Sequence, residues 1–422
     1  MKALDYRTHI LLALVAVLLS SCSSFVAIER SHHASSDSAF MHYLRSENIP
    51  VTYNNDVEIL NGAHAKFASM LDDISKAKHH VHLEYFNFRN DSIANLLFDI
   101  LAQKASEGIE VRAMFDAFGN SSNNRPLKKR HLKKIQESGI EIVKFDPIRF
   151  PFINHAFHRD HRKIVVIDGK IGYTGGMNIA DYYIDGLPEI GEWRDMHIKI
   201  EGNAVHQLQD IFLSMWNEET KQSIGGAAYY PINDDSSLKK NKKIAIVDRV
   251  PRKTANIMRR TYAEAIQTAE DKVQIINPYF TPTRIIKKAI KKALKKGVKV
   301  EIMIPGKSDI PFTPDAAFYI ANQLRKKGAD IYVYNGGFHH SKIMMVDSSY
   351  CTVGSTNLNS RSLRYDYEVN AFIFDHDITH ELINMFEEDQ MESTLLTKEE
   401  YKKRSAWRRF VGWFAHLLTP FL

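Results

Sequence analysis

The hydrophobic and polar positions of this chain follow the same order twice. In each half, a short apolar run typical of a strand precedes a stretch with helical spacing, and further strand-like runs follow. The first half carries these patterns at residues 81–86, 93–104, 108–116 and 138–143, and the second half carries them at 273–276, 284–296, 297–304 and 327–332. Because strands and helices alternate, the pattern predicts an α/β fold, and because the order repeats, it predicts two similar domains.

Shifts in composition divide the chain further. Residues 225–243 contain a glycine pair, a proline and many Asn, Asp, Ser and Lys residues, which is typical of a linker. The predicted organisation is a signal peptide at 1–22, a tether at 23–51, a first domain at 52–224, a linker at 225–243, a second domain at 244–398 and a membrane-associating segment at 399–422.

The amino terminus predicts export. Lys2 and Arg7 precede an apolar run over residues 10–19, which is too short for a helix that crosses a hydrocarbon core of about 30 Å. A run of this length is typical of a secretory signal. Residues 19–22, Leu-Ser-Ser-Cys, resemble a bacterial lipobox, so we expect cleavage before Cys22 and diacylation of its thiol. An uncleaved amino-terminal anchor with an incidental cysteine is the alternative.

The carboxyl terminus carries a second membrane signal. Cations such as Lys402 and Arg408 interleave with large apolar side chains at helical spacing, among them Trp407, Trp413 and Phe414. This pattern is typical of a helix that lies in the headgroup region of a bilayer. Packing of the same apolar residues on the protein's own core is the alternative.

The composition limits the class of protein. With 422 residues, of which 44% are hydrophobic, the chain can bury a sizeable core, and global disorder is excluded. The net charge of +6 leans toward anionic partners such as phosphates or lipid headgroups. The two cysteines, Cys22 and Cys351, lie far apart in the sequence, which excludes a disulfide scaffold and a cysteine-based zinc site.

Each half also carries the same polar constellation. The pattern is His-x-Lys-x4-Asp, with a glycine seven residues and an asparagine ten residues after the aspartate. The first copy consists of His161, Lys163, Asp168, Gly175 and Asn178, and the second copy consists of His340, Lys342, Asp347, Gly354 and Asn357. A chance match to His-x-Lys-x4-Asp is expected about 0.1 times in such a chain, so a duplicate is a strong signal.

These residue types suit chemistry on a phosphodiester. Residues i and i+2 of a strand face the same side, so each histidine and its lysine can point into one cleft. One neutral histidine attacks phosphorus to form a phosphohistidine, while the other, protonated, donates to the leaving alkoxide. Two lysines and two asparagines supply donors for the charge on the phosphate, so neither a metal nor a cofactor is expected.

Other roles stay open for some of these residues. Asp168 is followed by glycine, and Asp-Gly favours a hairpin turn, so this carboxylate can hold the turn instead of taking part in catalysis. Asp347 has the same ambiguity. His155, His158 and His161 are spaced three apart, which is compatible with a metal site, but no cysteine or carboxylate completes a ligand set.

The duplicated motif resembles that of the phospholipase D superfamily, and within it the chain is most similar to bacterial cardiolipin synthases. Further matching runs lie at residues 154–163, 277–282, 354–357 and 361–362, and the resemblance covers roughly residues 52–422. It implies two phospholipase D-type α/β domains packed as a pseudo-twofold pair with one shared active site. The implied activity is transfer of a phosphatidyl group between two phosphatidylglycerols, with release of glycerol.

The resemblance also implies roles for individual residues. It makes His161 the nucleophile, and it implies that an acid downstream of each motif orients a histidine. The residues implied to bind or orient the phosphate are Asn178, Asn357, Ser355, Asp195 and Glu368. The first copy has Gly176 where the second has Ser355, so we expect the two half-sites to differ.

Several functions compete on the sequence alone. A phosphatidyltransferase leads, and a hydrolase with the same site, either a phospholipase D or a nuclease, differs only in whether water resolves the phosphohistidine. A non-catalytic membrane scaffold is disfavoured because both motifs are complete. Membrane signals at both ends favour a phospholipid substrate, and no nucleic-acid-binding module is recognised. We expect attachment to the bacterial cell membrane through Cys22 or an uncleaved anchor, while the oligomeric state is not predicted.

Overall fold

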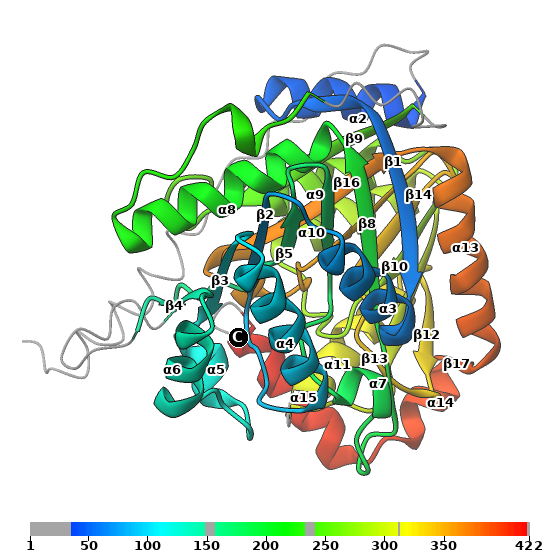
Figure 1. Cartoon of the computed structure of the whole chain (residues 1–422). Helices are drawn as coiled ribbons and strands as arrows, with labels where there is room; N and C mark the ends of the chain where they lie inside the picture. Colours follow the sequence, from blue (N-terminus) through cyan, green and yellow to red (C-terminus); the bar gives the residue numbers. More distant parts are fainter. Residues whose placement is uncertain (1–34, 148–156, 233–240, 311–312, 420–422) are drawn as a thin grey trace, which may run out of the picture. The chain divides into compact units, whose positions relative to one another are not determined.

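The computed structural model describes residues 35–147, 157–232, 241–310 and 313–419 (Figure 1). The predicted signal peptide, the lipobox at Cys22 and residues 23–34 of the predicted tether lie outside the described residues. Residues Ser35–Leu422 form one compact unit by their contacts.

One long sheet forms the centre of this unit. Fifteen strands of the described residues pair side by side in the order β17-β12-β11-β10-β14-β15-β16-β9-β1-β8-β6-β5-β2-β3-β4. The first half supplies β1 (Val51–Asn61), β2 (His80–Tyr85), β3 (Glu110–Asp116), β4 (Glu141–Phe145), β5 (Lys163–Ile167), β6 (Ile171–Gly175) and β8 (Met196–Gly202). The second half supplies β9 (Lys242–Arg249), β10 (Lys272–Ile276), β11 (Lys299–Pro305), β12 (Asp330–Tyr334), β14 (Ile343–Val346), β15 (Tyr350–Gly354), β16 (Glu368–Phe374) and β17 (Ser393–Leu395).

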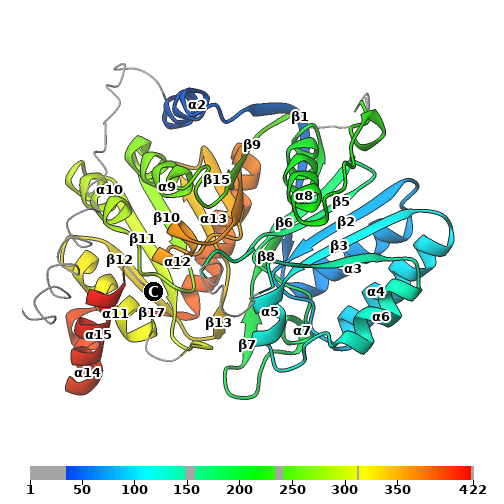
Figure 2. The ribbon, with the colours of Figure 1, turned by 90° about the vertical axis from the view of Figure 1, so that its left-hand side faces the viewer.

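Apart from the edge strand β17, which has no counterpart, the strand order reads the same outward from the centre in both directions. The antiparallel pair β1 and β9 forms the centre, and the outer strands β2, β3 and β4 run parallel, as do β10, β11 and β12. The predicted pair of similar α/β domains is confirmed. Figure 2 shows the first half, blue to green, beside the second, yellow-green to red. The two halves share one continuous sheet, and the second half begins with β9, inside the predicted linker.

Helices cover both faces of this sheet. They are α3 (Ala63–Ser75), α4 (Ser92–Ser106), α5 (Ala117–Ser122), α6 (Lys129–Glu137), α7 (Tyr182–Asp185) and α8 (Ala204–Thr220) in the first half, and α9 (Ile257–Thr268), α10 (Arg284–Lys295), α11 (Thr313–Arg325), α12 (Ser360–Arg364) and α13 (His376–Met391) in the second. Apolar residues of α8 and α13 pack in one cluster with the central strands, and those of α3 and α4 pack in another with β2 and β3. Because helices cover both faces of the sheet, every residue of β5 and β14 is buried, and both strands consist mainly of apolar residues.

The structure corrects the predicted tether over its described part. Residues Ser36–Ser46 form α2, in which Phe40 and Leu44 are completely buried. The ring of Phe40 stacks on Tyr350 of β15, with centroids 5.0 Å apart. The polar run at residues 35–38 suggested a tether, but apolar residues four apart on one helix face are enough to dock this segment on the fold.

Two helices end the described chain, α14 (Lys398–Lys403) and α15 (Ala406–Leu418). α15 packs against α11. None of the helices in the described ranges is both long enough and apolar enough to cross a membrane.

Candidate active site

A short parallel ladder joins the two halves beside the second motif. β7 (Glu192–Arg194) pairs with β13 (Gly337–His339), and the backbone N–H of His340 donates to the carbonyl oxygen of Arg194 at 2.7 Å. Each strand ends one residue before a predicted site residue. The ladder therefore brings Asp195 and His340 together.

The same arrangement recurs beside the first motif. Asp160 and Tyr367 form a parallel bridge, and the backbone N–H of His161 donates to the carbonyl oxygen of Tyr367 at 3.1 Å. Because Glu368 follows Tyr367, the bridge brings Glu368 to His161. The two halves thus contribute to both half-sites in the same way.

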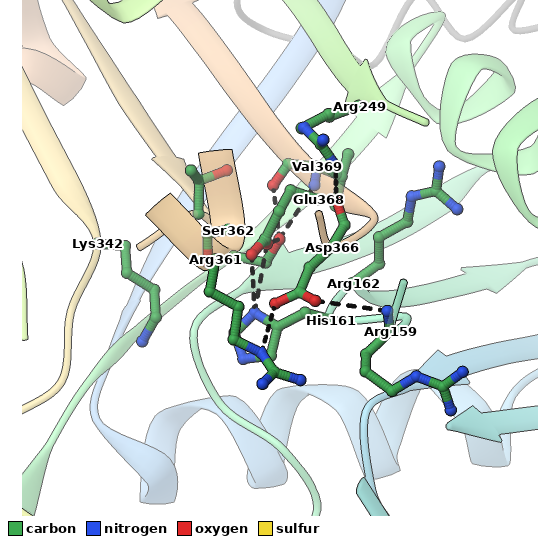
Figure 3. Close-up of polar contacts among 12 residues, drawn as sticks. Arg159, His161, Arg162, Arg249, Lys342, Arg361, Ser362, Asp366, Glu368 and Val369 are labelled. Carbon is green, nitrogen blue, oxygen red and sulfur yellow. Dashed lines mark hydrogen bonds and ion pairs between the residues drawn. The ribbon is translucent and has the colours of Figure 1, made fainter. Parts of the chain in front are cut away.

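Each histidine binds an acid from the other half of the chain. Nδ1 of His340 lies 2.6 Å from Oδ2 of Asp195, and Nδ1 of His161 lies 3.1 Å from Oε1 of Glu368. Figure 3 shows His161 and Glu368 among their polar neighbours. The acid that follows each motif thus orients the histidine of the other motif. With Nδ1 held by a carboxylate, Nε2 of His161 is left for the substrate, whereas Nε2 of His340 also lies 3.2 Å from Nζ of Lys342.

Lys163 and Lys342 lie directly behind the histidines and are buried. Nζ of Lys163 donates to the carbonyl oxygen of His161 at 2.6 Å, and Nζ of Lys342 lies 2.9 Å from Nδ1 of His340. Both histidines precede their strands, so the predicted arrangement along a regular strand does not hold at the histidines. The lysines place positive charge beneath the imidazoles.

The two histidines open into one cleft of about 610 Å³ between the halves. Asn178 and Asn357 line the same cleft, as predicted for residues that bind the phosphate. Asp195 and Glu368 lie behind the imidazoles that they bind, and both are completely buried. One cleft therefore receives an imidazole and a carboxamide from each half.

The expected difference between the half-sites has a steric cause. A Cβ added at Gly176 would lie 2.2 Å from Oδ1 of Asp195, so no larger residue fits there without displacing the carboxylate. At the equivalent position, the hydroxyl of Ser355 donates to Glu368. The structure therefore supports an orienting role for Ser355.

Burial and the two lysines shift the ionisation of the histidines. Burial, followed by the ammonium of Lys163, lowers the pKa of His161 well below its ordinary value. Burial, followed by the ammonium of Lys342, lowers the pKa of His340 to about 4. Burial also lowers the pKa of Lys163 to about 7 and that of Lys342 to about 8. An anionic phosphodiester in the cleft would raise the pKa of both imidazoles, so protonation of the general acid is coupled to substrate binding.

The two orienting acids differ in charge state. Burial acts to raise the pKa of Asp195, but the ammonium of Lys342 and the ring of His340 hold it below its ordinary value. Burial raises the pKa of Glu368 to about 7, against the lowering effect of Lys163. Asp195 is therefore ionised at neutral pH, whereas Glu368 titrates close to neutrality.

Asp168 and Asp347 bind backbone at the turns that follow β5 and β14. The carboxylate of Asp168 accepts from the N–H groups of residues 78–80 at 2.7–3.0 Å, and that of Asp347 accepts from residues 270–272 at 2.7–2.8 Å. Both residues have positive φ, 55° and 50°. These contacts contradict the predicted catalytic role of Asp168 and Asp347. Both carboxylates instead hold a turn, which is the alternative that the sequence left open.

Removing either turn carboxylate should destabilise the fold without changing the chemistry. We expect Asp168→Ala and Asp347→Ala each to lower the free energy of unfolding by about 1–3 kcal/mol, because three N–H groups lose their acceptor. Denaturant unfolding of the purified variants measures the loss, and Asp99→Ala, on the exposed side of α4, is the matched control. A fall in turnover per folded molecule would contradict this prediction and show that these carboxylates take part in catalysis.

Sequence reasoning missed the polar groups at the His161 end of the cleft. The guanidinium Nε of Arg361 lies 3.2 Å from Oδ2 of Asp366 (Figure 3), and both residues line the cleft. Arg361 follows Asn357 by four residues, where the first copy has Tyr182 after Asn178. Comparing the two copies beyond the asparagine would have identified this position.

The His340 end of the cleft is aromatic instead. The rings of Trp193 and Tyr279 lie 5.4 Å and 6.0 Å from the imidazole of His340, and the hydroxyl of Tyr279 donates to Asp309 at 2.7 Å. Trp193 lies in β7 and Tyr279 in the connection after β10, so no spacing in the sequence groups them. The two ends of the cleft therefore present different chemistry to a substrate.

The histidines weighed as metal ligands have other partners where they are described. His155 lies outside the described residues, and Nδ1 of His158 lies 3.0 Å from the carbonyl oxygen of Tyr365. Over the described ranges, no group of three or more His, Cys, Asp and Glu side chains could hold a metal ion.

A doubled α/β sheet with two His-x-Lys motifs facing one cleft defines a phospholipase D-type enzyme, and comparison with known proteins refines this class. The family model described as "Cardiolipin synthase, PLD-like domain" matches residues 70–216 and 262–390. The chain belongs to this cardiolipin synthase family of the phospholipase D superfamily.

Individual relatives agree with the family match. The chain is 37% identical over 373 residues to the major cardiolipin synthase of Bacillus subtilis, covering 88% of this chain and 76% of the relative. It is 35% identical over 387 residues to the cardiolipin synthase of Oceanobacillus iheyensis, covering 92% and 79%. The crystal structure of phosphatidylserine synthase from Haemophilus influenzae superposes with a TM-score of 0.68 over 91% of this chain and 100% of that one. At 16% identity, this last likeness shows the fold alone.

Proposed function

We propose that this protein is a cardiolipin synthase, which transfers the phosphatidyl group of one phosphatidylglycerol to a hydroxyl of a second and releases glycerol. The observation that carries the proposal is the pair of imidazoles in one cleft, each with Nδ1 on a carboxylate from the opposite half. The names of the curated relatives support the same reaction.

The first step forms a phosphohistidine. Nε2 of His161, which we take as the nucleophile on family resemblance, attacks phosphorus, and the bond from phosphorus to the glycerol oxygen breaks. Protonated His340 gives its proton to that oxygen, and glycerol leaves. The amides of the two asparagines, which line the cleft, donate to the phosphoryl oxygens, and Lys163 and Lys342, buried behind the imidazoles, add positive charge at a distance.

The second step restores the enzyme. His340, now neutral, takes the proton from a hydroxyl of the second phosphatidylglycerol, whose oxygen attacks phosphorus while the bond to His161 breaks. The products are cardiolipin, the free imidazole of His161 and protonated His340. The aromatic side chains of Trp193 and Tyr279 lie beside His340 and offer an apolar wall to the acyl-bearing acceptor in this step.

Expression in a bacterium that lacks cardiolipin separates the transferase from its rival hydrolase. We expect cardiolipin in the total lipid extract of cells that express the wild-type protein. Accumulation of phosphatidic acid without cardiolipin would instead identify a phospholipase D-type hydrolase. Loss of nucleic acid in the same cells, with unchanged lipids, would identify a nuclease.

The proposed mechanism needs no metal ion. Two asparagines in the cleft bind the phosphodiester and two buried lysines behind the imidazoles offset its charge, so we expect the purified enzyme to keep its full activity in excess EDTA. Cardiolipin formation from radiolabelled phosphatidylglycerol measures this. Complete loss of activity, restored by one added metal, would contradict the metal-free mechanism.

We propose that the mature chain is held at the bacterial cell membrane through a diacylated Cys22. Each buried methylene contributes about 0.8 kcal/mol, and two or more acyl chains exceed the marginal binding of one chain. Cys22→Ser should therefore block incorporation of labelled palmitate and leave an unprocessed precursor in membrane fractions. If the wild-type protein incorporates no Cys22-dependent palmitate, an uncleaved amino-terminal anchor becomes the better interpretation.

A further inference from the structure

Two small residues and one histidine, and not the large apolar side chains, attach α15 to α11. A Cβ added at Gly412 would lie 2.4 Å from the carbonyl oxygen of Asp315, so glycine lets α15 approach α11 this closely. Ala415 is buried on the same face. The ring of His416 packs on Tyr319 of α11, with centroids 4.4 Å apart.

The opposite face of α15 carries the large apolar side chains. They are Trp407, Phe410, Trp413, Phe414, Leu417 and Leu418, which are 44–69% exposed. At about 100° per residue, these side chains occupy the half of the helix opposite Gly412 and Ala415. The alternative in which they pack on the protein's own core is therefore wrong for the described chain. We call this set the outer face of α15.

The rim of the cleft also carries exposed apolar side chains. Phe118, Phe157 and Ile310 line the cleft and are 37–65% exposed. Ile310 lies shortly before α11, whose first turn contains Asp315, the residue that Gly412 approaches. α15 therefore lies next to the segment that forms one side of the cleft mouth, and Figure 1 shows α15 beside α11.

Cations accompany the outer face. The guanidinium of Arg404 is turned inward, where it pairs with Asp315 and lies 3.9 Å from the ring centroid of Phe318. Lys402 and Lys403, at the end of α14, are exposed at the surface, whereas Arg408 precedes Gly412 by four residues and so belongs to the α11 side of α15. This stretch of chain therefore offers anionic headgroups positive charge beside an apolar stripe.

We infer that the outer face of α15 and the apolar rim of the cleft form one surface that inserts into a bilayer containing anionic lipid, so that the cleft opens onto the headgroups. This inference rests on the proposed function, since it states how a lipid substrate reaches the site. With 13 residues, α15 is about 20 Å long, which is shorter than a hydrocarbon core of about 30 Å. It therefore lies in the plane of the interface, with its tryptophans at headgroup level.

Charge favours a bilayer over a second copy of this chain as the occupant. A symmetric contact between two copies would bring the same patch, with the exposed Lys402 and Lys403 next to it, against itself. Anionic headgroups neutralise these cations while the acyl chains receive the apolar side chains.

Quenching of tryptophan fluorescence by brominated lipid tests the insertion. The full-length protein is reconstituted into vesicles of phosphatidylcholine and phosphatidylglycerol, with or without bromine on the acyl chains. Of the four tryptophans, Trp193 and Trp216 are buried, whereas Trp407 and Trp413 belong to the outer face. We expect bromine to quench the wild-type protein, and we expect Trp407→Phe/Trp413→Phe to lose that quenching because it keeps the apolar face but lacks both fluorophores.

Turnover on two forms of the substrate tests the consequence for the enzyme. Phe410→Ser/Phe414→Ser removes exposed apolar area and leaves the contact with α11 intact. We expect this variant to convert phosphatidylglycerol in vesicles about tenfold more slowly, and short-chain phosphatidylglycerol in solution at the wild-type rate. Leu96→Ser/Met391→Ser, which removes exposed apolar side chains elsewhere, is the matched control and should change neither rate.

Each outcome decides the inference. Absence of quenching in the wild-type protein, or an equal loss of turnover on both substrates, would overturn it. A dimer in sedimentation velocity that Phe410→Ser/Phe414→Ser abolishes would assign the outer face to a second copy and overturn the bilayer as occupant. If the wild-type protein forms no cardiolipin but is quenched, the proposed function fails and the docking surface stands.

Discussion

His161→Ala and His340→Ala should each reduce cardiolipin formation by at least about 10³-fold. His161→Ala removes the atom that bonds to phosphorus, and His340→Ala removes the proton donor to the leaving glycerol. Neither half can compensate, because the cleft contains one motif histidine from each half. Conversion of radiolabelled phosphatidylglycerol in mixed micelles by the purified variants measures the effect.

Exposed histidines provide the control for these variants. His42→Ala on α2 and His64→Ala on α3 change surface positions and should keep the wild-type rate. Activity above a tenth of wild type in either motif variant would contradict the shared site. Phosphate recovered on His340 instead of His161 in a rapidly denatured reaction would exchange the two roles and leave the site intact.

The two orienting acids should respond differently to loss of charge. Asp195 is ionised at neutral pH, and its carboxylate oxygen lies 2.6 Å from Nδ1 of His340. Asp195→Asn therefore removes a full negative charge next to this nitrogen. We expect turnover to fall roughly 10²-fold across the range of about pH 6 to 8, because an amide neither fixes the tautomer nor stabilises the imidazolium. Steady-state rates of cardiolipin formation over that range measure it.

The loss of turnover caused by Glu368→Gln should instead depend on pH. Burial raises the pKa of Glu368 to about 7, so this acid is protonated below neutrality and ionised above it. Glutamine mimics the protonated carboxyl, and we therefore expect little loss below about pH 7 and a growing loss as the pH rises past it. Glu387→Gln, on the exposed side of α13, is the control. A pH-independent penalty would show that Glu368 does not titrate in this range.

The sequence alone was sufficient for the fold class and for the residues at the reacting centre. Alternating strand and helix patterns are local, and their repetition in two halves reveals a duplicated α/β fold without any long-range information. The duplicated motif placed His161, His340, Asn178 and Asn357 in one site, because five residue types at identical spacing in both halves rarely arise by chance.

Residues with two chemically reasonable roles could not be assigned from the sequence. A carboxylate before a turn can hold backbone or take part in catalysis, and only the N–H groups of residues 78–80 and 270–272 show that Asp168 and Asp347 hold backbone. Likewise, the polar start of α2 concealed a helix, because its stability comes from docking Phe40 on a strand three hundred residues away.

Tertiary structure alone decided which acid serves which histidine. Spacing along the chain attaches Asp195 to the first motif and Glu368 to the second, yet pairing of β7 with β13 and the bridge from Asp160 to Tyr367 exchange them between the halves. Tertiary structure also decided that α15 turns its aromatic side chains away from α11. The helical periodicity of this segment is the same whether these side chains pack on the protein or face outward. Sequence spacing thus determined the chemistry that the chain carries, whereas contacts between distant segments determined the direction in which each group points. The reason is that the spacing of residues contains no information about which strand edge or helix face will lie next to a given residue.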